Sequence, residues 1–502
     1  MGKIITQTLN RFDGGVIADV RSKKANGAQL AKYFDILAYP SSLKPHNSSE
    51  SGNDTAAREI QRFLFANERL YGLGVVSGQT YAKIFNKTVF TDDTWNEPSN
   101  SEASSLACDF GLFVFYSYGG ANYLFGANGT AGTGQIWRHT IATNFTGNHQ
   151  ALNFTTINQG LVHSKDDILY IPYDNKIAKN NAGSWTTAAL TLPVDYVIQT
   201  ICEYGNYLAI GCAPLVTAGR QTSRVFLWDR DSTVTTLSES IEVGNDRLMM
   251  LAEYEGTLFT LGYLGKRVIA RQYNGSGFKK VAEIRSSAVA NPILSTRTQR
   301  TNDRLYFLGD ITIDGTQHEG VWSFGRSVGG ELAFSFDRTA NNDTDVNSFY
   351  SFHFESVSGI DYMFVSYNDG AGGKQVSKTN DSATTFSASS VYETLINPIG
   401  YEGAKAELLD VSKKKDLVAV TVTHEPLPTA GSVTVKYKID AETSWSSAII
   451  TNTTDDSLSA SAVTGLPKDW KEIRFQITST GGAVITGLKY VTEITGKDIY
   501  DA

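Results

Sequence analysis

The chain repeats one hydrophobic pattern along most of its length. In each copy a polar turn is followed by a stretch in which aliphatic and aromatic residues alternate. The two most similar copies read NERLYGLG from Asn67 and NDRLYFLG from Asn302. Alternation with a period of two is typical of a half-buried β-strand. The pattern therefore predicts a protein built from repeated strand units.

Looser copies of the same phrase lie between and beyond these two. One hydrophobic anchor marks each of the seven copies: Leu70, Leu112, Leu169, Leu208, Leu258, Leu305 and Met363. The anchors are 42, 57, 39, 50, 47 and 58 residues apart. A repeat of this length with strand-type units is typical of a β-propeller, with one blade for each repeat. Seven blades fit the spacing best, and six or eight blades are the alternatives.

Aromatic residues also recur inside the repeats. One series ends a later strand, and a second series follows a small polar turn: Trp137, Trp228 and Trp322, then Trp95, Trp185, Phe278 and Phe386. These rings could be platforms on which a ligand stacks, or they could pack between neighbouring blades. Because a propeller is stabilised by burying the faces of its sheets against one another, the pattern favours packing.

The first 55 residues lack the repeat. Residues 27–36 form an ordered stretch whose pattern is compatible with either a helix or a strand, and residues 39–53 are rich in turn-forming residues. We expect residues 1–55 to be an N-terminal arm, which docks on a neighbouring subunit or on the chain's own blades. Residues 56–395 are then the propeller.

The pattern changes again in residues 396–502. Residues 417–422, 432–439 and 472–477 alternate with period two and are separated by turns rich in Pro, Gly and Ser. Strands at this spacing predict a small antiparallel β-sandwich, to which residues 488–494 could belong unless they return to the propeller. The predicted fold class is therefore all-β: a roughly seven-bladed β-propeller with an N-terminal arm and a C-terminal antiparallel β-sandwich.

Charge and hydropathy bear on the partners. The formal net charge is −8, and the two basic runs at residues 21–24 and 413–415 are short enough to be solvated turns. Because a DNA-binding surface needs clustered cations, we expect no sequence-specific nucleic acid partner. No apolar run reaches the length of about 18 residues that a membrane helix needs, and no secretory signal follows Met1, so we expect no membrane insertion.

No residue pattern assigns a catalytic, cofactor-binding or metal-binding site. Cys108, Cys202 and Cys212 have no metal-ligand spacing; Cys202 and Cys212 could pair across neighbouring strands, although three small buried side chains are favoured. The seven histidines show no local ligand spacing, and motifs of nucleophilic, phosphoryl or dinucleotide chemistry are missing. We expect no cofactor and no enzymatic activity, with the paired carboxylates of a glycoside hydrolase as the alternative.

One segment resembles a known structural motif. The sequence TNDSATTF at residues 379–386 is similar to the Asp-box of sialidase-like propellers, with Ala383 where that pattern has glycine. The resemblance implies a structural turn away from any active site. The Arg-Ile-Pro signature of sialidases has no counterpart, since Ile171 and Pro172 follow Tyr170.

Both ends of the chain resemble structural proteins of tailed bacteriophages. The matching segments are RFDGG from Arg11 and YFD from Tyr33 near the beginning. Near the end they are THEPLP from Thr423, GSVTVKY from Gly431, LP from Leu466, EIRF from Glu472, STGGA from Ser479 and ITGLKY from Ile485. They are similar to the beginning of such proteins and to a β-sandwich at their end, and together they cover about a third of the chain. The resemblance implies a virion component, in the tail, and it carries over no catalytic residue.

We therefore expect a non-enzymatic structural component of a phage virion, most simply a tail nozzle or ring protein. Its partners would be other virion proteins of the tail or connector and copies of itself. It would be located in the virion tail and be soluble in the host cytoplasm before assembly. The alternatives are a tail protein that binds a host surface glycan and a propeller glycoside hydrolase with acids at a central pocket.

Overall fold

The protein is described by a computed structural model, in which strands account for nearly all regular structure. The described residues are 3–12, 16, 28–32, 34–39, 41–44, 58–76, 83–88, 90, 95–96, 108–129, 133–141, 144–215, 222–231, 237, 239–244, 246–287, 293–301, 304–327, 330–338, 348–368, 374–380, 389–398 and 406–495. Within them the one helix is the short α1 (Ala406–Leu409).

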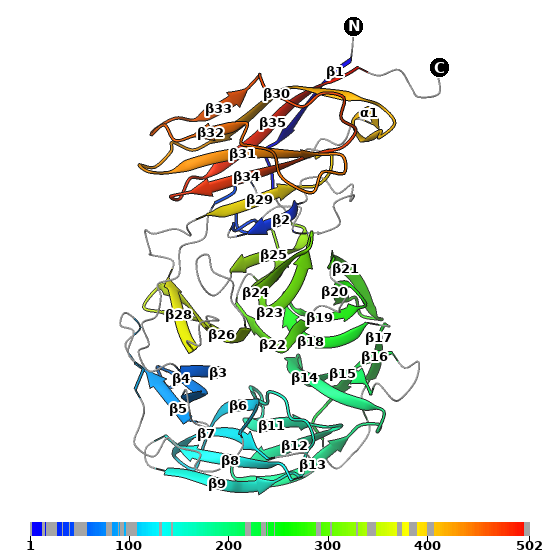
Figure 1. Ribbon diagram of the computed structural model, residues 1–502. Helices are drawn as coiled ribbons and strands as arrows, with labels where there is room; N and C mark the ends of the chain where they lie inside the picture. Colours follow the sequence, from blue (N-terminus) through cyan, green and yellow to red (C-terminus); the bar gives the residue numbers. More distant parts are fainter. Residues whose placement is uncertain are drawn as a thin grey trace.

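Seven antiparallel sheets follow one another around a ring, which Figure 1 shows with the blades arranged about a common axis. The first four blades are β3 (Arg58–Ala66), β4 (Arg69–Val76) and β5 (Lys83–Lys87); β6 (Cys108–Tyr118), β7 (Ala121–Asn128), β8 (Gln135–Thr140) and β9 (Asn144–Ala151); β10 (Leu161–His163), β11 (Ile168–Tyr173), β12 (Lys176–Asn181) and β13 (Ser184–Thr191); β14 (Tyr196–Tyr204), β15 (Tyr207–Pro214), β16 (Ser223–Trp228) and β17 (Glu239–Gly244). The last three are β18 (Arg247–Tyr254), β19 (Thr257–Leu264), β20 (Arg267–Tyr273) and β21 (Phe278–Arg285); β22 (Ile293–Arg300), β23 (Arg304–Ile313), β24 (Thr316–Arg326) and β25 (Leu332–Arg338); β26 (Ser348–Val357), β27 (Ile360–Asn368) and β28 (Lys374–Asn380). The predicted seven-bladed propeller is confirmed.

The repeated phrase corresponds to the hairpin that joins the first two strands of a blade. Its polar turn supplies residues that tolerate the left-handed region, such as Asn67 with φ 51° and Glu68 with φ 58°. Six of the seven predicted anchors lie in the second strand of their blade, but Leu112 lies in the first strand, β6. The equivalent residue of β7 is the buried Leu124. Both strands of this blade alternate hydrophobic residues, so the pattern did not separate them.

The recurring aromatic residues pack inside the ring. Trp137, Trp228 and Trp322 are fully buried, and the Trp228 ring meets Tyr170 of the preceding blade edge-on at 5.8 Å between centroids. Trp95 meets Phe364 at 6.4 Å and thereby joins the first blade to the seventh. The interpretation as packing residues is confirmed for these rings, while Phe386 lies outside the described residues.

The C-terminal region forms two packed sheets. One contains β1 (Lys3–Leu9), β35 (Ile485–Ile494), β30 (Lys415–His424) and β33 (Ser459–Ala462), in that order. The other contains β29 (Ser390–Thr394), β34 (Ile473–Thr480), β31 (Ser432–Ile439) and β32 (Ile450–Asn452). Alternate residues such as Val420, Phe475, Ile477 and Tyr490 are buried between the sheets, as the period-two pattern requires.

The N-terminal arm is part of this sandwich. β1 pairs with β35 along its whole length, so residues 488–494 belong to the sandwich. Residues 27–36, whose pattern was compatible with a helix or a strand, contain the strand β2 (Ala28–Lys32). It pairs antiparallel with β29 and contacts β25 through one parallel pair, Lys32 with Phe336. The described part of the arm thus docks on the chain's own sandwich and sixth blade. β29 itself comes from the range predicted for the propeller but pairs with β34.

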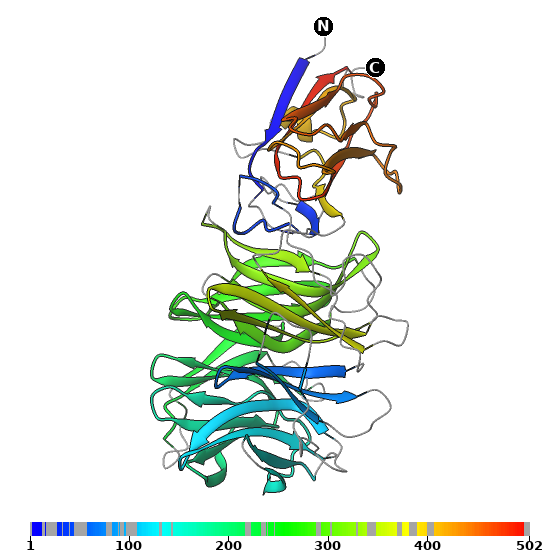
Figure 2. The same ribbon diagram turned by 90° about the vertical axis from the view of Figure 1, so that its left-hand side faces the viewer.

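A nine-stranded sheet therefore joins the two parts, in the order β22-β23-β24-β25-β2-β29-β34-β31-β32. Figure 2 shows that the sandwich stands on the rim of the ring, away from the ring axis. Ion pairs support the junction: Asp314, in the turn between β23 and β24, lies 3.6 Å from Lys438 and 3.4 Å from Arg474. Arg304 of β23 lies 3.2 Å from Asp35 of the arm.

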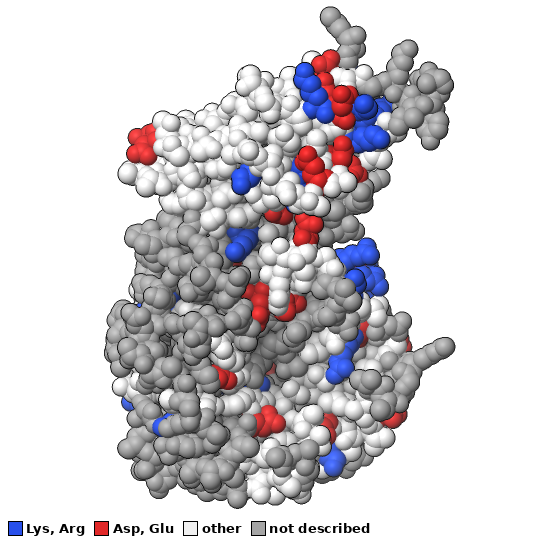
Figure 3. Space-filling model, in the orientation of Figure 1, with Lys and Arg blue, Asp and Glu red and all other residues white. Residues whose placement is uncertain are grey.

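No helix among the described residues is both long and apolar enough to cross a membrane. On the face in Figure 3, Lys and Arg gather over β20 and β21, in an otherwise mixed surface. A groove here is lined by Lys266, Arg267 and Arg285 together with Glu283. The predicted basic run at residues 413–415 differs from a solvated turn, because Lys415 is buried and its Nζ donates to the carbonyl oxygens of Asp410 and Lys471, each at 2.8 Å.

Candidate functional site

The main cavity lies on the axis of the ring and has a volume of about 650 Å³. Five innermost strands, β3, β14, β18, β22 and β26, and the segment before β10 supply its walls. The charged and titratable residues that line it are Arg62, Cys202, Glu203, Glu253, Arg300, His353 and Glu355. This is the site in which a propeller hydrolase would hold its catalytic acids. The partners of each carboxylate therefore bear on whether it could act on a substrate.

Each of the three glutamate carboxylates contacts another protein group of the cavity wall. Glu203 accepts hydrogen bonds from the backbone N–H and the hydroxyl of Ser164, at 2.5 and 2.7 Å. Glu253 forms an ion pair with Arg300, and Glu355 lies 3.1 Å from His353. The contacts of Glu203 and Glu253 link neighbouring blades, whereas Glu355 and His353 lie on the same strand, β26. All three carboxylates are held by protein partners along the wall of the cavity.

Two glutamines connect adjacent inner strands in the manner of a β-ladder. The Gln159 amide donates to the carbonyl of Phe113 at 2.6 Å and accepts from its N–H at 3.2 Å. Gln299 makes the same pair of bonds with Phe354, accepting its N–H at 2.6 Å. A side-chain amide carries both a donor and an acceptor, so it can satisfy one peptide group completely. These bonds join the second blade to the third and the sixth to the seventh.

Polar side chains also close the ring between its first and last blades. The hydroxyl of Ser351 donates to the carbonyl of Ile60 at 2.5 Å, and Ser366 accepts the Ile60 N–H at 3.0 Å. On the other side of the first blade, Arg62 donates to the carbonyls of Phe110 and Gly111, both at 2.5 Å. Among the described residues, the first and the last blade are thus joined by side-chain to backbone bonds.

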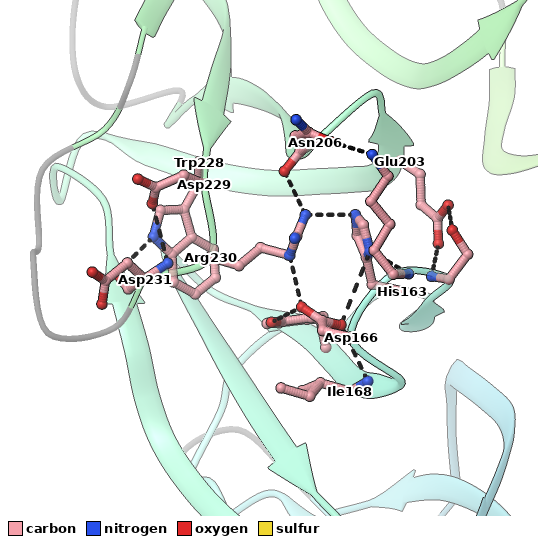
Figure 4. A network of polar contacts seen from close by, with 12 residues as sticks. His163, Asp166, Ile168, Glu203, Asn206, Trp228, Asp229, Arg230 and Asp231 are labelled. Carbon is pink, nitrogen blue, oxygen red and sulfur yellow. Dashed lines mark hydrogen bonds and ion pairs between the residues drawn. The ribbon is translucent and has the colours of Figure 1, made fainter.

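A third group of bonds joins the third and fourth blades near the hairpin turns (Figure 4). Arg230, whose φ is 69°, directs its guanidinium at Asp166 and His163, with Nε 2.7 Å from Asp166 Oδ2 and Nη1 2.8 Å from His163 Nε2. The same Nη1 donates to the carbonyl of Asn206 at 2.5 Å. Asp166 also accepts from Tyr170, whose pKa is raised by burial and by that carboxylate. This is a bridge between blades, with its groups directed at one another.

The cysteines and histidines named by sequence do not form a site among the described residues. Cys202 lies opposite Ala209 and Cys212 opposite Ile198, so the two cysteines are not paired, and both thiols are free. Burial raises the pKa of both thiols, which makes them poor nucleophiles. No group of three or more His, Cys, Asp or Glu in this part of the chain could hold a metal ion. The Cys108 side chain and His46 lie outside what the structure describes.

The bridging residues were missed by sequence reasoning. Gln159, Gln299 and Ser351 lie in or beside innermost strands; Ser351 interrupts a run of aromatic residues, whereas the two glutamines are flanked mainly by polar residues. A polar residue that interrupts an alternating strand facing the ring axis is the only signal available. It indicates a buried polar position but does not indicate the backbone group that the side chain will meet.

The comparisons with known proteins concern the fold. No protein-family model matches the sequence, and no curated protein matches it. Among solved structures, the chain is similar to the Dos1 propeller (12% identity, 70% of this chain and 82% of that chain, TM-score 0.40) and to an exo-β-1,3-galactanase from Phanerochaete chrysosporium (10%, 85% and 94%, TM-score 0.31). It is also similar to a candidate 6-phosphogluconolactonase from Bacteroides fragilis (11%, 66% and 96%, TM-score 0.41).

Proposed function

We propose that this protein is a non-enzymatic structural component of a tailed-phage virion, acting in a tail nozzle or ring. The supporting observation is that the two ends of the chain, which carry the resemblance to phage structural proteins, fold together. β1 from the N-terminus pairs with β35 from the C-terminus, and Phe12 packs edge-on against Tyr392 at 5.3 Å. Phe12 and the resembling segments near the C-terminus thus belong to one sandwich, which is fixed to the rim of a propeller.

The cavity geometry fits a supporting role for the propeller. The glutamates of the main cavity bind protein groups, and its glutamines complete peptide groups of neighbouring blades. Such bonds stiffen the ring, because they tie neighbouring blades to each other near the axis. A rigid disc with a sandwich at its rim offers separate surfaces for other virion proteins and for further copies of the chain.

The sandwich also exposes hydrophobic side chains. Ile4 in β1, Val418 in β30, and Leu458 and Val463 on either side of β33 are 40 to 69% exposed. These four side chains are candidates for contact with another protein, because large exposed apolar groups are stabilised when a partner buries them. We therefore expect assembly contacts to involve the sandwich, and the propeller to carry a smaller share of them.

Quantitative mass spectrometry of purified particles tests this proposal. A fixed, low copy number relative to the capsid protein supports a tail position, and about six or about twelve copies support a ring. Recovery of the chain only from the soluble lysate would overturn the virion role. Complementation with Val463→Asp should then reduce incorporation, while Val194→Asp, whose site on the propeller is 76% exposed, serves as the matched control. Equal incorporation of both variants would argue against a contact through the sandwich.

The hydrolase alternative has its own test. If Glu253 acted as a catalytic carboxylate, Glu253→Gln would abolish cleavage of a susceptible glycan and leave binding intact. Under the proposed structural role, wild-type protein and this variant release no reducing sugar from any glycan of the host surface. Release that depends on Glu253 would replace the structural proposal with the enzymatic one.

A further inference from the structure

A second cavity of about 460 Å³ lies where the innermost strands begin, at the opposite end from the glutamates of the main cavity. Consecutive blades from the second to the fifth line it. Its polar side chains include Asp109, Thr155, Asn158, Gln199 and Arg247. Gln199 lines both cavities, so the two spaces adjoin along the axis.

The polar groups of this second cavity retain unused bonding capacity, in contrast to those of the main cavity. The Arg247 side chain forms no hydrogen bond or ion pair with the described residues, and its Nε is buried without a partner there. The amide of Gln199, only 8% exposed, likewise meets no hydrogen-bond partner in the described part of the chain. Asp109 uses one oxygen, Oδ1, to accept the Gly111 N–H at 2.7 Å. An unpaired buried polar group is costly, which favours a ligand that supplies the partners.

The wall that carries Asn158 is held in place. The carboxylate of Asp174 accepts the N–H groups of Thr155 and Thr156, at 3.0 and 2.8 Å. Asn158 donates its side-chain N–H to the carbonyl of Ile198 at 2.8 Å, which leaves its side-chain oxygen as an acceptor. A wall fixed before binding lowers the entropic cost of holding a ligand.

We propose that this cavity binds a sugar acid, with its carboxylate on Arg247 and its hydroxyls on Asp109, Asn158 and Gln199. A guanidinium matches a carboxylate with two parallel hydrogen bonds, whereas ring hydroxyls both donate and accept and so match amides and a carboxylate. The cavity lies within the range of about 300–1,000 Å³ that is usual for small-molecule sites. Burial also raises the pKa of the Asp109 carboxyl, so a hydroxyl donor would stabilise its charged form.

The alternative ligand is a zwitterion such as an amino acid. It could pair its carboxylate with Arg247 and its ammonium with Asp109. Thr155, Asn158 and Gln199 are uncharged groups that such a ligand would leave without partners. Because they make up most of the polar lining, a polyhydroxylated acid satisfies more of the site.

Isothermal titration calorimetry on the full chain with glucuronate, and with glucose as its uncharged counterpart, tests the proposal. We expect glucuronate to bind at least about tenfold more tightly than glucose. Arg247→Gln should remove this preference, while Arg267→Gln, at an exposed arginine on the fifth blade, should keep it. Circular dichroism and thermal unfolding show whether each variant is folded.

A second variant keeps the test decisive if Arg247→Gln fails to fold. Asp109→Asn keeps an oxygen for the Gly111 N–H, so it preserves the local fold, and it should weaken glucuronate binding. Three results would overturn the proposal: no binding of glucuronate or galacturonate at millimolar concentration, unchanged affinity in a folded variant, or glycine binding as tightly as the sugar acids. The site goes beyond the proposed assembly role, and binding by the isolated chain does not depend on incorporation into a particle.

Discussion

The propeller and the sandwich are both built from antiparallel strands, but they bring those strands together differently. Each blade uses strands that are adjacent in sequence, so its hydrogen bonds close over short hairpins. The sandwich joins β1, from the first ten residues, to β35, from the last twenty, and inserts β29 beside β34. Local pairing costs little loop-closure entropy, whereas the sandwich must close the whole chain. The sandwich is therefore the part that depends on both ends being present.

The largest effect on the sandwich relative to the propeller is expected when a buried aromatic ring of the arm is removed. Phe12 is fully buried, and Phe12→Ala should destabilise the sandwich by about 3–5 kcal/mol, since the cavity cannot collapse completely. Differential scanning calorimetry should show the sandwich transition shifting to lower temperature while the propeller transition stays in place. Equal shifts of both transitions would mean that the nine-stranded sheet couples the two parts into one unfolding unit.

Within the propeller, Gly126 packs directly against the ring of Trp137 and leaves no room for a side chain. A Cβ on Gly126 would lie 2.0 Å from the Trp137 ring, so Gly126→Ala must displace a fully buried side chain. We expect a loss of about 1–3 kcal/mol in the free energy of unfolding of the propeller. Gly277→Ala is the matched control, because nothing lies within 4 Å of the added Cβ. Comparable stability of the two variants in urea unfolding would contradict the close packing of the second blade.

The blades, whose strands pair locally, could be predicted from the sequence better than the long-range strand pairs of the sandwich. The sequence repeat predicted seven blades because each copy, such as the one at Leu305, contains its own turn and its own strand. The secondary structure of residues 28–32 could not be predicted from the sequence. A segment of five residues is too short to show a helix or strand period, and no turn or pairing strand lies next to it in the sequence. Their strand conformation comes from β29, more than 350 residues away.

The cavities were still less predictable. Arg247 and Asp109 line the same cavity, but they begin different blades and lie far apart in sequence. A propeller brings the starts of its inner strands together around one axis, so convergence depends on ring closure. Residue types alone indicated only that polar positions existed in these strands.

A side-chain bridge between blades can be removed with a smaller expected effect. Gln299→Leu leaves the N–H and carbonyl of Phe354 without their partners, which should cost about 1–3 kcal/mol. Amide hydrogen exchange at Phe354 should accelerate along with the loss of stability. Gln317→Leu, at an exposed position of β24, provides the control. Unchanged protection at Phe354 would show that packing alone holds the sixth and seventh blades together.

Lys415 offers a pH-dependent test of the sandwich. Burial lowers its pKa from the usual 10.5 to about 8, so between these values the folded state binds fewer protons than the unfolded state. The free energy of unfolding should therefore rise with pH above about 8, as the cost of burying the charge is relieved. Lys415→Met should lack this rise in thermal unfolding of the sandwich between pH 8 and 10. A parallel pH profile for both proteins would rule out Lys415 as its source.

The smallest effect is expected at the junction, where Asp314 meets Lys438 and Arg474. Asp314 is 44% exposed, so Asp314→Asn should change the free energy of unfolding by less than about 1 kcal/mol, with the difference fading in high salt. Small-angle scattering should show the same angle between propeller and sandwich, because the continuous sheet through β2 fixes it. The alternative result is that the angle changes at low salt. The contact between β2 and β25, a single residue pair of Lys32 with Phe336, would then be too limited to fix the orientation. That result would mean that the ion pairs of Asp314, rather than the sheet through β2, set how the two parts are oriented.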